Sequence, residues 1–347
     1  MQTMRTGITR RFALACLFGG VSAVGGAAPA FAGEVLVSGF GSSTVSRYDP
    51  LTKVLIGNLP GGSISNPQAV TLGPDQNLYI ANEGADNVLR YNARTKQFID
   101  VFVSTGSGGL DGPTGLTFGP DGNLYVASFE TDQILRYDGT TGAFLGPILG
   151  VFVAAGAGGL NGPDVGIVFG PDGHLYVPSF FTNRVLKYDG STGASLGTFI
   201  NGGVVVCPQP RTIIFRPDGN VYVSSDSGDK VVKFTSAGTL IGDFITSGAG
   251  GLDGASGMIF AADKLVYVTS WRNDKVLRYN AGTGAFVDEF ASGLPLDGPT
   301  FVMQLPDSIV PTVSEWGMAT MGLLLLTAGS FLLRRPRLAQ ASATALA

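Results

Sequence analysis

The chain has 347 residues, of which 44% are hydrophobic and 14% are charged, and its formal net charge is −4. This composition argues against an intrinsically disordered protein, which would be richer in charge and poorer in apolar residues. Six arginines lie near the two ends and leave the middle of the chain more acidic. We therefore expect no nucleic acid partner, because an acidic surface repels phosphate. The 52 glycines predict many tight turns.

Residues 1–32 are a predicted secretory signal peptide. They contain no acidic residue, carry three arginines, and continue through an apolar stretch at 14–24 to the sequence Ala30-Phe31-Ala32. Signal peptidase is therefore an expected partner, with cleavage after Ala32, and a twin-arginine signal at Thr9-Arg10-Arg11 is the alternative. Only Cys207 remains after cleavage, so no intramolecular disulfide is expected.

One unit of sequence recurs six times along the body of the chain. Its clearest copy is GPDGNLYVASFETDQILRYDG, at residues 119–139. The last aromatic residue of the unit recurs every 43 to 51 residues, at Tyr48, Tyr91, Tyr137, Tyr188, Phe234 and Tyr279. A repeat of this length without a sustained helical period predicts a β-propeller rather than a helical solenoid.

Each unit contains four short apolar stretches separated by Gly, Pro, Asp and Asn. In the third unit the predicted strands are 115–119, Leu124–Ser128, Gln133–Tyr137, and a fourth from 143–145 leading toward Val151–Val153. The connector at 119–123 has the Pro and Gly that hairpin turns favour. The expected fold class is all-β, a six-bladed propeller of four-stranded antiparallel blades.

The body begins and ends in the middle of a unit. Residues 34–39 (EVLVSG) match a second strand, whereas residues 300–305 (TFVMQL) match a first strand. We therefore expect one blade to be assembled from both ends of the body. The N- and C-terminal strands would then pair and close the ring without an exposed edge.

The repeated units carry a family resemblance. Units of the form P-x-G-L-x-F-x-P-D-G-N-L-Y-V-x-S-x-x-x-x-x-I-L-R-Y-D resemble NHL-type repeats. Residues 33–307 as a whole are similar to the group of propellers that contains NHL proteins, virginiamycin B lyase-like proteins and gluconolactonase-like proteins. The resemblance implies the fold and leaves the function open, because one scaffold carries many activities.

The starts of the first strands are a candidate site. These strands surround the axis of a propeller, so their first residues should ring the mouth of the central channel. The second residue of each first strand varies between units: Gln68, Thr114, Asp164, Arg211, Ser256 and Thr300. A varied polar ring on a repeated scaffold predicts ligand binding, and solvated strand starts are the alternative.

Aromatic residues follow four of the second strands, at Phe40, Phe129, Phe180 and Trp271. Glu83 and Asp226 take the two remaining positions. We predict that the four aromatics form a binding face for sugar rings or a peptide. The alternative is that they cap the hydrophobic core between blades.

Residues suited to catalysis are scarce. The resemblance implies that a virginiamycin B lyase-like enzyme would need a histidine, an acid and a metal, but His174 is the single histidine and replaces a turn asparagine. Matching loop residues are expected to stabilise turns, with calcium binding as the alternative: Asp111, Asn161, Asp253 and Asp297. We expect no catalytic residue, no metal site and no cofactor, with a divalent cation as the alternative.

The C-terminal region has three consecutive parts: a linker with a motif at 308–316, a predicted transmembrane helix at 317–333 and a basic cytoplasmic tail at 334–347. Its motif block resembles the IPTL-type sorting signals of Gram-negative bacteria and consists of Val310, Pro311, Thr312, Val313, Ser314, Glu315, Trp316 and Gly317. The resemblance implies processing by an exosortase-like membrane protease. A plain single-pass membrane anchor is the alternative.

Taken together, these patterns predict an exported, non-enzymatic binding or scaffold propeller. It would lie in the cell envelope, at the cell surface or in the extracellular matrix of a Gram-negative-type bacterium. A glycan or an envelope protein is the expected ligand. The alternatives are a metal-dependent lactonase or lyase of the gluconolactonase-like or virginiamycin B lyase-like type, and a purely structural surface protein.

Overall fold

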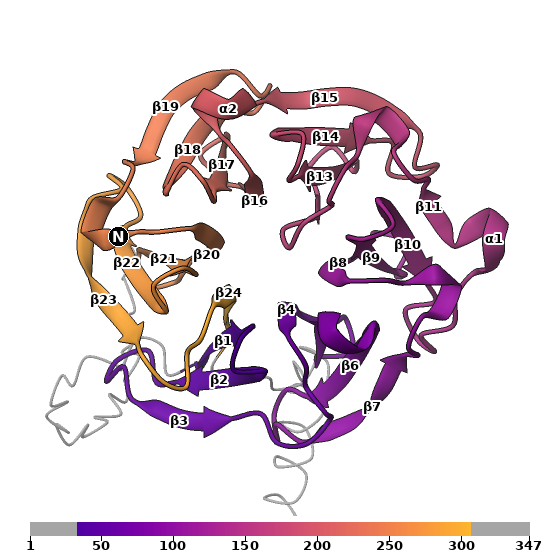
Figure 1. Cartoon of the computed structure of the whole chain (residues 1–347), viewed down its shortest axis with the longest axis horizontal. Coiled ribbons are helices and arrows are strands. Elements are labelled where there is room, and N and C mark those ends of the chain that lie inside the picture. The colour runs from indigo at the N-terminus through magenta and orange to yellow at the C-terminus, as the bar shows by residue number, and fades with distance from the viewer. Residues whose placement is uncertain (1–32, 307–347) are drawn as a thin grey trace, which may run out of the picture. The chain divides into compact units, whose positions relative to one another are not determined.

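The computed structural model describes residues 33–306, which form a ring of six four-stranded sheets (Figure 1). The predicted signal peptide, the sorting motif and the predicted helix at 317–333 lie outside these residues. Within 33–306, no helix is long and apolar enough to cross a membrane. The all-β, six-bladed prediction is therefore confirmed for the body of the chain.

The first three blades follow one another around the ring. Blade 1 consists of β24 (Pro299–Gln304), β1 (Val35–Gly39), β2 (Thr44–Tyr48) and β3 (Leu55–Asn58). Blade 2 consists of β4 (Pro67–Leu72), β5 (Asn77–Asn82), β6 (Asn87–Asn92) and β7 (Phe98–Val103). Blade 3 consists of β8 (Pro113–Phe118), β9 (Leu124–Ser128), β10 (Gln133–Tyr137) and β11 (Val151–Val153).

The other three blades complete the ring. Blade 4 consists of β12 (Val168–Phe169), β13 (Leu175–Ser179), β14 (Arg184–Tyr188) and β15 (Ser195–Asn201). Blade 5 consists of β16 (Pro210–Phe215), β17 (Asn220–Ser225), β18 (Lys230–Thr235) and β19 (Leu240–Ile245). Blade 6 consists of β20 (Ala255–Phe260), β21 (Leu265–Ser270), β22 (Lys275–Asn280) and β23 (Phe286–Ser292). Within each blade all paired strands are antiparallel.

The two ends of the body close the ring in blade 1. Strand β24 pairs antiparallel with β1, with Val302 opposite Val37. The backbone N–H of Leu305 extends the pairing by donating to the carbonyl of Glu34 at 2.8 Å. The predicted closure is confirmed, and it leaves β1 with a partner on both sides.

The fourth strand of blade 3 is shorter than the sequence predicts. It contains only Val151–Val153, and a short helix, α1 (Gly146–Leu149), separates it from the predicted strand start at 143–145. Phe144 makes one isolated bridge to Tyr137. Pro147 explains the difference, because proline has no N–H for a strand ladder and suits the first turn of a helix. A second short helix, α2 (Gly203–Val206), lies between β15 and β16.

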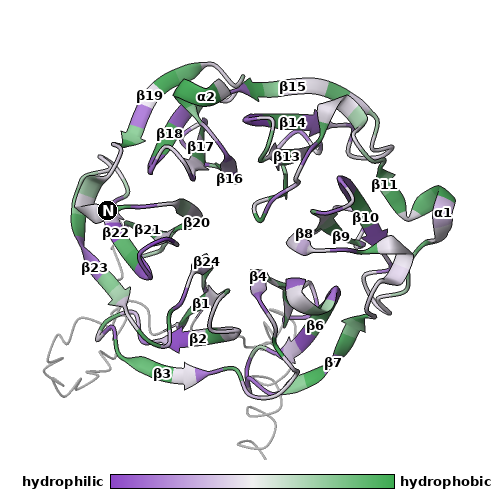
Figure 2. Ribbon diagram, in the orientation of Figure 1, coloured by the Kyte–Doolittle hydropathy of each residue, from purple (hydrophilic) through white to green (hydrophobic). Residues whose placement is uncertain are grey.

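The hydrophobic core is divided into six clusters, one between each pair of neighbouring blades. Between blades 3 and 4, for example, the Tyr125 ring packs edge-on against Phe152 of its own blade and Phe169 of the next, at 4.7 and 5.0 Å. Apolar residues also occur on the outermost strands, such as β3 and β7 (Figure 2). Each sheet thus packs on both of its faces, and its outer edge meets solvent.

The repeated Asp and Tyr residues hold each blade together. In five blades the turn aspartate accepts a hydrogen bond of 2.8–2.9 Å from the tyrosine hydroxyl four residues later: Asp75–Tyr79, Asp121–Tyr125, Asp172–Tyr176, Asp218–Tyr222 and Asp263–Tyr267. Blade 1 has no such turn, because its first two strands come from opposite ends of the body. These bonds give the repeated D-G-N-L-Y sequence a structural role.

A second repeated bond joins every blade to the next. In each blade, one residue with positive φ lies between the second and third strands. Its side-chain oxygen accepts a hydrogen bond of 2.7–3.2 Å from a backbone N–H in the segment that leads into the first strand of the next blade. The acceptors are Ser43, Asp86, Asp132, Asn183, Asp229 and Asp274. Ser, Asp and Asn have short side chains that reach nearby backbone, and Asp and Asn tolerate this conformation. We call these six contacts the inter-blade bonds.

The inner strands approach one another closely around the axis. A Cβ atom added to Gly115 would lie 2.5 Å from the carbonyl oxygen of Asp164, in the neighbouring blade. A Cβ added to Gly257 would lie 2.5 Å from the Cα of Phe301. Glycine is therefore required at these positions because the backbones themselves are in contact.

The tyrosine that ends the third strand provides a test of how the repeat is stabilised. The buried Tyr137 hydroxyl donates to the carbonyl of Ser107 at 2.7 Å. Tyr137→Phe should lower the free energy of unfolding by about 1 kcal/mol, because the carbonyl loses its partner while the ring packing is retained. Urea denaturation would measure this loss. Thr140→Ala, an exposed change on the same hairpin, is the control, and equal stabilities of the two variants would contradict the prediction.

Candidate ligand-binding pocket

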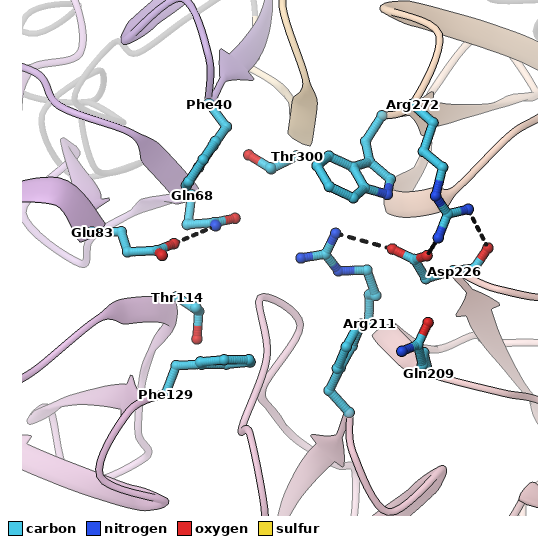
Figure 3. A pocket seen from close by; sticks show the side chains of 12 residues that line it. Phe40, Gln68, Glu83, Thr114, Phe129, Gln209, Arg211, Asp226, Arg272 and Thr300 are labelled. Carbon is cyan, nitrogen blue, oxygen red and sulfur yellow. Dashed lines mark hydrogen bonds and ion pairs between the residues drawn. The ribbon is translucent and has the colours of Figure 1, made fainter.

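A pocket of about 370 Å³ lies where all six blades meet at one end of the ring axis. Twelve side chains line it, and each comes either from the start of an inner strand or from the loop after a second strand: Phe40, Gln68, Glu83, Thr114, Phe129, Phe180, Gln209, Arg211, Asp226, Trp271, Arg272 and Thr300 (Figure 3). The volume falls within the range of small-molecule sites. The pocket therefore has the size and the mixed polar and aromatic lining of a binding site.

The structure brings together most of the residues that the sequence singles out. All four aromatic residues line the pocket, as do four members of the polar ring: Gln68, Thr114, Arg211 and Thr300. Asp164 and Ser256 are fully buried and do not line it. The ring of strand starts is thus only partly available to a ligand.

Three hydroxyl groups of the polar ring join neighbouring blades. The Thr114 hydroxyl donates to the carbonyl of Pro163 at 2.7 Å, and the Ser256 hydroxyl donates to the carbonyl of Thr300 at 2.8 Å. The Thr300 hydroxyl donates in turn to the carbonyl of Pro67 at 3.1 Å. Each bond crosses from one inner strand to the next, so these side chains stabilise the ring at the pocket floor.

A buried ion network occupies the blade 5 side of the pocket. The Arg211 Nε donates to Asp164 at 3.0 Å, and the Arg211 Nη1 donates to Asp226 at 3.3 Å. Arg272 also donates to Asp226, from the neighbouring blade 6. Asp164 and Asp226 are 0% and 1% exposed and Arg211 is 8% exposed. Buried charges need such pairing, because an unpaired one would be strongly destabilising.

Burial and neighbouring charges shift the pKa values of Asp226 and Arg211 in opposite directions. Burial raises the pKa of the Asp226 carboxyl, and the guanidinium groups of Arg211 and Arg272 only partly offset this effect. Burial lowers the pKa of Arg211, but Asp164 and Asp226 outweigh it and raise the pKa overall. Arg211 therefore stays charged in the centre of the pocket.

Glu83 and Gln68 form the opposite side of the pocket. They come from blade 2, which faces blade 5 across the ring (Figure 1). The Gln68 Nε2 donates to the Glu83 carboxylate at 2.5 Å (Figure 3). Burial raises the pKa of Glu83, and the hydrogen bond from Gln68 and the charge of Arg211 offset this only in part.

The aromatic residues are partly exposed and surround the polar groups. The Arg211 guanidinium lies 5.5 Å from the Phe180 ring centroid and 5.6 Å from that of Trp271. Phe129 contacts Phe180 with ring centroids 6.3 Å apart. Two of the four rings therefore hold the arginine by cation–π contacts, and their open edges still line the pocket.

Two lining residues were missed by sequence reasoning. Arg272 follows Trp271 directly, and its side chain reaches back to Asp226 in blade 5. Gln209 lies in the segment that replaces the glycine-rich loop before β16, and its side chain accepts from Ser227. The unusual loop was a usable signal for Gln209, whereas a contact between two blades leaves no trace in the sequence of a single unit.

The single histidine and the four matching loop residues do not line the pocket. The backbone N–H of Gly190 donates to His174 Nδ1 at 3.2 Å on a hairpin turn, and His174 does not line the pocket. Throughout residues 33–306, no group of three or more His, Cys, Asp or Glu side chains is arranged to hold a metal ion. The loop residue Asp253 instead lies 3.5 Å from the Arg272 guanidinium.

Comparisons with known proteins match the fold. No family model and no curated protein matches the sequence. The structure is similar to a protein of unknown function from Bacteroides caccae, with a TM-score of 0.62, 13% identity and coverage of 79% of this chain and 99% of the other. It is also similar to a chain of a nidogen/laminin complex, with a TM-score of 0.59, 14% identity and coverage of 78% and 97%.

A third similar structure is virginiamycin B lyase from Staphylococcus aureus, with a TM-score of 0.53, 15% identity and coverage of 78% of this chain and 85% of the other. The shared feature is the fold. These neighbours confirm the propeller fold that the resemblance implies. At such low identity they carry no residue role over to this chain.

The buried network predicts a large effect of removing one acid. Asp164→Ala should lower the free energy of unfolding by about 3 kcal/mol, because Arg211 loses a partner inside the protein. Chemical denaturation at neutral pH would measure the loss. Asp111→Ala removes an exposed acid and should change stability by less than about 0.5 kcal/mol. Similar values for the two variants would show that the network contributes no stability.

The raised pKa of Glu83 predicts that this residue destabilises the fold at neutral pH. Its folded pKa lies above the ordinary value of 4.5, so stability falls as pH rises through that value toward the folded pKa. Glu83→Gln should therefore unfold less readily than the wild type at pH 7, and the difference should vanish below about pH 4, where the acid is protonated in both states.

Thermal denaturation across this pH range would follow the effect. Glu130→Gln is a matched control, because Glu130 is exposed and also acts electrostatically on Glu83. It removes the same charge but leaves the half-buried carboxylate of Glu83 in place. A Glu83→Gln variant that is less stable than the wild type at pH 7 would contradict the argument.

Proposed function

We propose that the protein is an exported binding propeller that holds a small ligand, or one unit of a polymer, in the pocket on the ring axis. The observation that supports this best is the convergence of four aromatic residues and a set of fixed polar groups in one pocket. Binding sites commonly combine apolar walls with a few oriented polar groups in this way.

The chemistry of the lining favours a ligand with both a flat apolar face and hydrogen-bonding groups. Aromatic side chains pack against such faces, while the side chains of Gln68, Glu83 and Arg211 set the orientation of polar groups. A sugar unit has both features, and so does a short peptide. A glycan or an envelope protein therefore agrees with the pocket as a ligand source.

The proposed location rests on the sequence pattern. The predicted signal peptide at 1–32 and the arginine-rich segment after 333 support a location outside the cytoplasm. The motif at 310–317 would make an exosortase-like membrane protease a partner, with the helix at 317–333 holding the chain in the membrane before processing. The cell surface, the envelope and the extracellular matrix are the resulting sites of action.

Retention on immobilised envelope polysaccharides and envelope proteins would test the binding function. Trp271→Ala and Phe129→Ala should each weaken retention about tenfold, because each removes an aromatic wall from the pocket. Phe286→Ala is the control, since Phe286 lies on the outer strand β23 with 44% of its surface exposed. Equal loss in all three variants, or no retention of any envelope fraction by the wild type, would refute the function.

A further inference from the structure

The pocket is electrically asymmetric along one diameter of the ring. Arg211 and Arg272 balance Asp164 and Asp226 on the blade 5 side. Glu83 lies across from them on blade 2, and no salt bridge to it occurs within the described residues that form the pocket (Figure 3). One negative charge is thus left for a ligand to neutralise. Arg272 also lies within 3.5 Å of the partly exposed acids Asp229 and Asp253, so the net charge around the pocket is more negative still.

On the blade 2 side of the pocket, Glu83 and Gln68 have acceptor oxygens that suit a hydrogen-bond donor from a ligand. An ionised carboxylate only accepts hydrogen bonds, so the Gln68 amide must turn its Nε2 toward Glu83. This orientation leaves the Gln68 Oε1 without a partner, although the side chain is 95% buried. Figure 3 shows this oxygen directed toward the centre of the pocket. The Glu83 carboxylate and the Gln68 Oε1 are therefore two acceptors that need N–H or O–H groups from elsewhere.

On the blade 5 side of the pocket, unused N–H donors suit a hydrogen-bond acceptor from a ligand. The Trp271 Nε1 is buried and has no hydrogen-bond partner. Arg211 has five N–H donors, and the bonds to Asp164 and Asp226 use three of them. The remaining donors of Arg211 suit carbonyl, hydroxyl or ether oxygens, whereas the indole N–H faces Gly254 rather than the pocket.

The walls beside Glu83 are aromatic. Phe40 and Phe129 come from blades 1 and 3, which flank blade 2 on either side. Within residues 33–306, no cation–π contact to either ring is observed, whereas Phe180 and Trp271 already contact Arg211. A cation placed at Glu83 would meet two free aromatic walls, which stabilise an ammonium group electrostatically.

We propose that the pocket binds a small ligand through a protonated primary amine, with the ammonium group on Glu83 and Gln68 and acceptor oxygens toward Arg211. The proposal rests on the binding function above and specifies its ligand class. An amino sugar has this arrangement, with an amine next to hydroxyl and ring oxygens. An amino acid amide shares the amine and one carbonyl oxygen.

Calorimetric titration of the full chain with four probes tests the ligand class and distinguishes its sources. The probes are the β-1,4-linked glucosamine disaccharide, its N-acetylated form, cellobiose and alaninamide. The glucosamine disaccharide should bind about tenfold more tightly than cellobiose, which differs from it only in having a hydroxyl at the position of each amine. Tight binding of alaninamide with weak binding of the disaccharide would assign the amine to amino acids rather than sugars and would still support the proposal.

Glu83→Gln separates the role of the charge from the role of the pocket shape. This variant should lose the preference for the amine, so that the glucosamine disaccharide and cellobiose bind to it with similar affinities. Glu130→Gln is the matched control and should retain the preference. Equal affinities of wild type and Glu83→Gln for every amine probe, or no binding of any amine probe, would overturn the proposal.

The two proposals fail in different ways. If envelope polymers are retained in a Trp271-dependent manner but Glu83→Gln retains them as well as the wild type, the ligand class is wrong and the binding function stands. If retention does not depend on Trp271, the binding function itself fails.

Discussion

The pairing of β24 with β1 is the interaction on which the rest of the structure depends. It joins strands that are separated by almost the whole body of the chain. A blade has apolar residues on both faces, so it needs a neighbour on each side, and only a closed ring supplies one to all six. The six inter-blade bonds then set each blade against the next at the same point. Closure thus brings six equivalent strand starts to one axis.

The pocket arises because equivalent positions on this scaffold carry different side chains. Where the ring must hold together, hydroxyl groups at Thr114, Ser256 and Thr300 bond to the next inner strand. Where a ligand could act, larger polar groups occupy the same positions, as at Gln68 and Arg211. Some of the six equivalent positions therefore stabilise the ring, and others are available to contact a ligand. The two sides of the pocket differ as a result, because the acid of blade 2 faces the arginine of blade 5.

Much of the fold, and part of the site, could be predicted from the sequence. Strand periodicity and turn residues were sufficient to predict six blades, and the offset between the two ends predicted the closure. The position of the strand starts was also sufficient to bring Gln68 and Arg211 to one axis. Sequence reasoning did not predict the burial of Asp164 beneath Arg211, since the two belong to different blades. It also did not single out Asp86 and its equivalents, whose side chains join each blade to the next.

The buried polar groups of the pocket differ in what they contribute to the free protein. Asp164, Arg211 and Asp226 pair with one another, which offsets part of the cost of burying them. Glu83 has only the amide of Gln68, and its raised pKa shows that the protein does not favour its charge. A carboxylate kept in an unfavourable environment at the centre of a pocket is typical of a functional position. A cation beside Glu83 would offset this cost, and Glu83, unlike Asp226, has no guanidinium partner in the described residues.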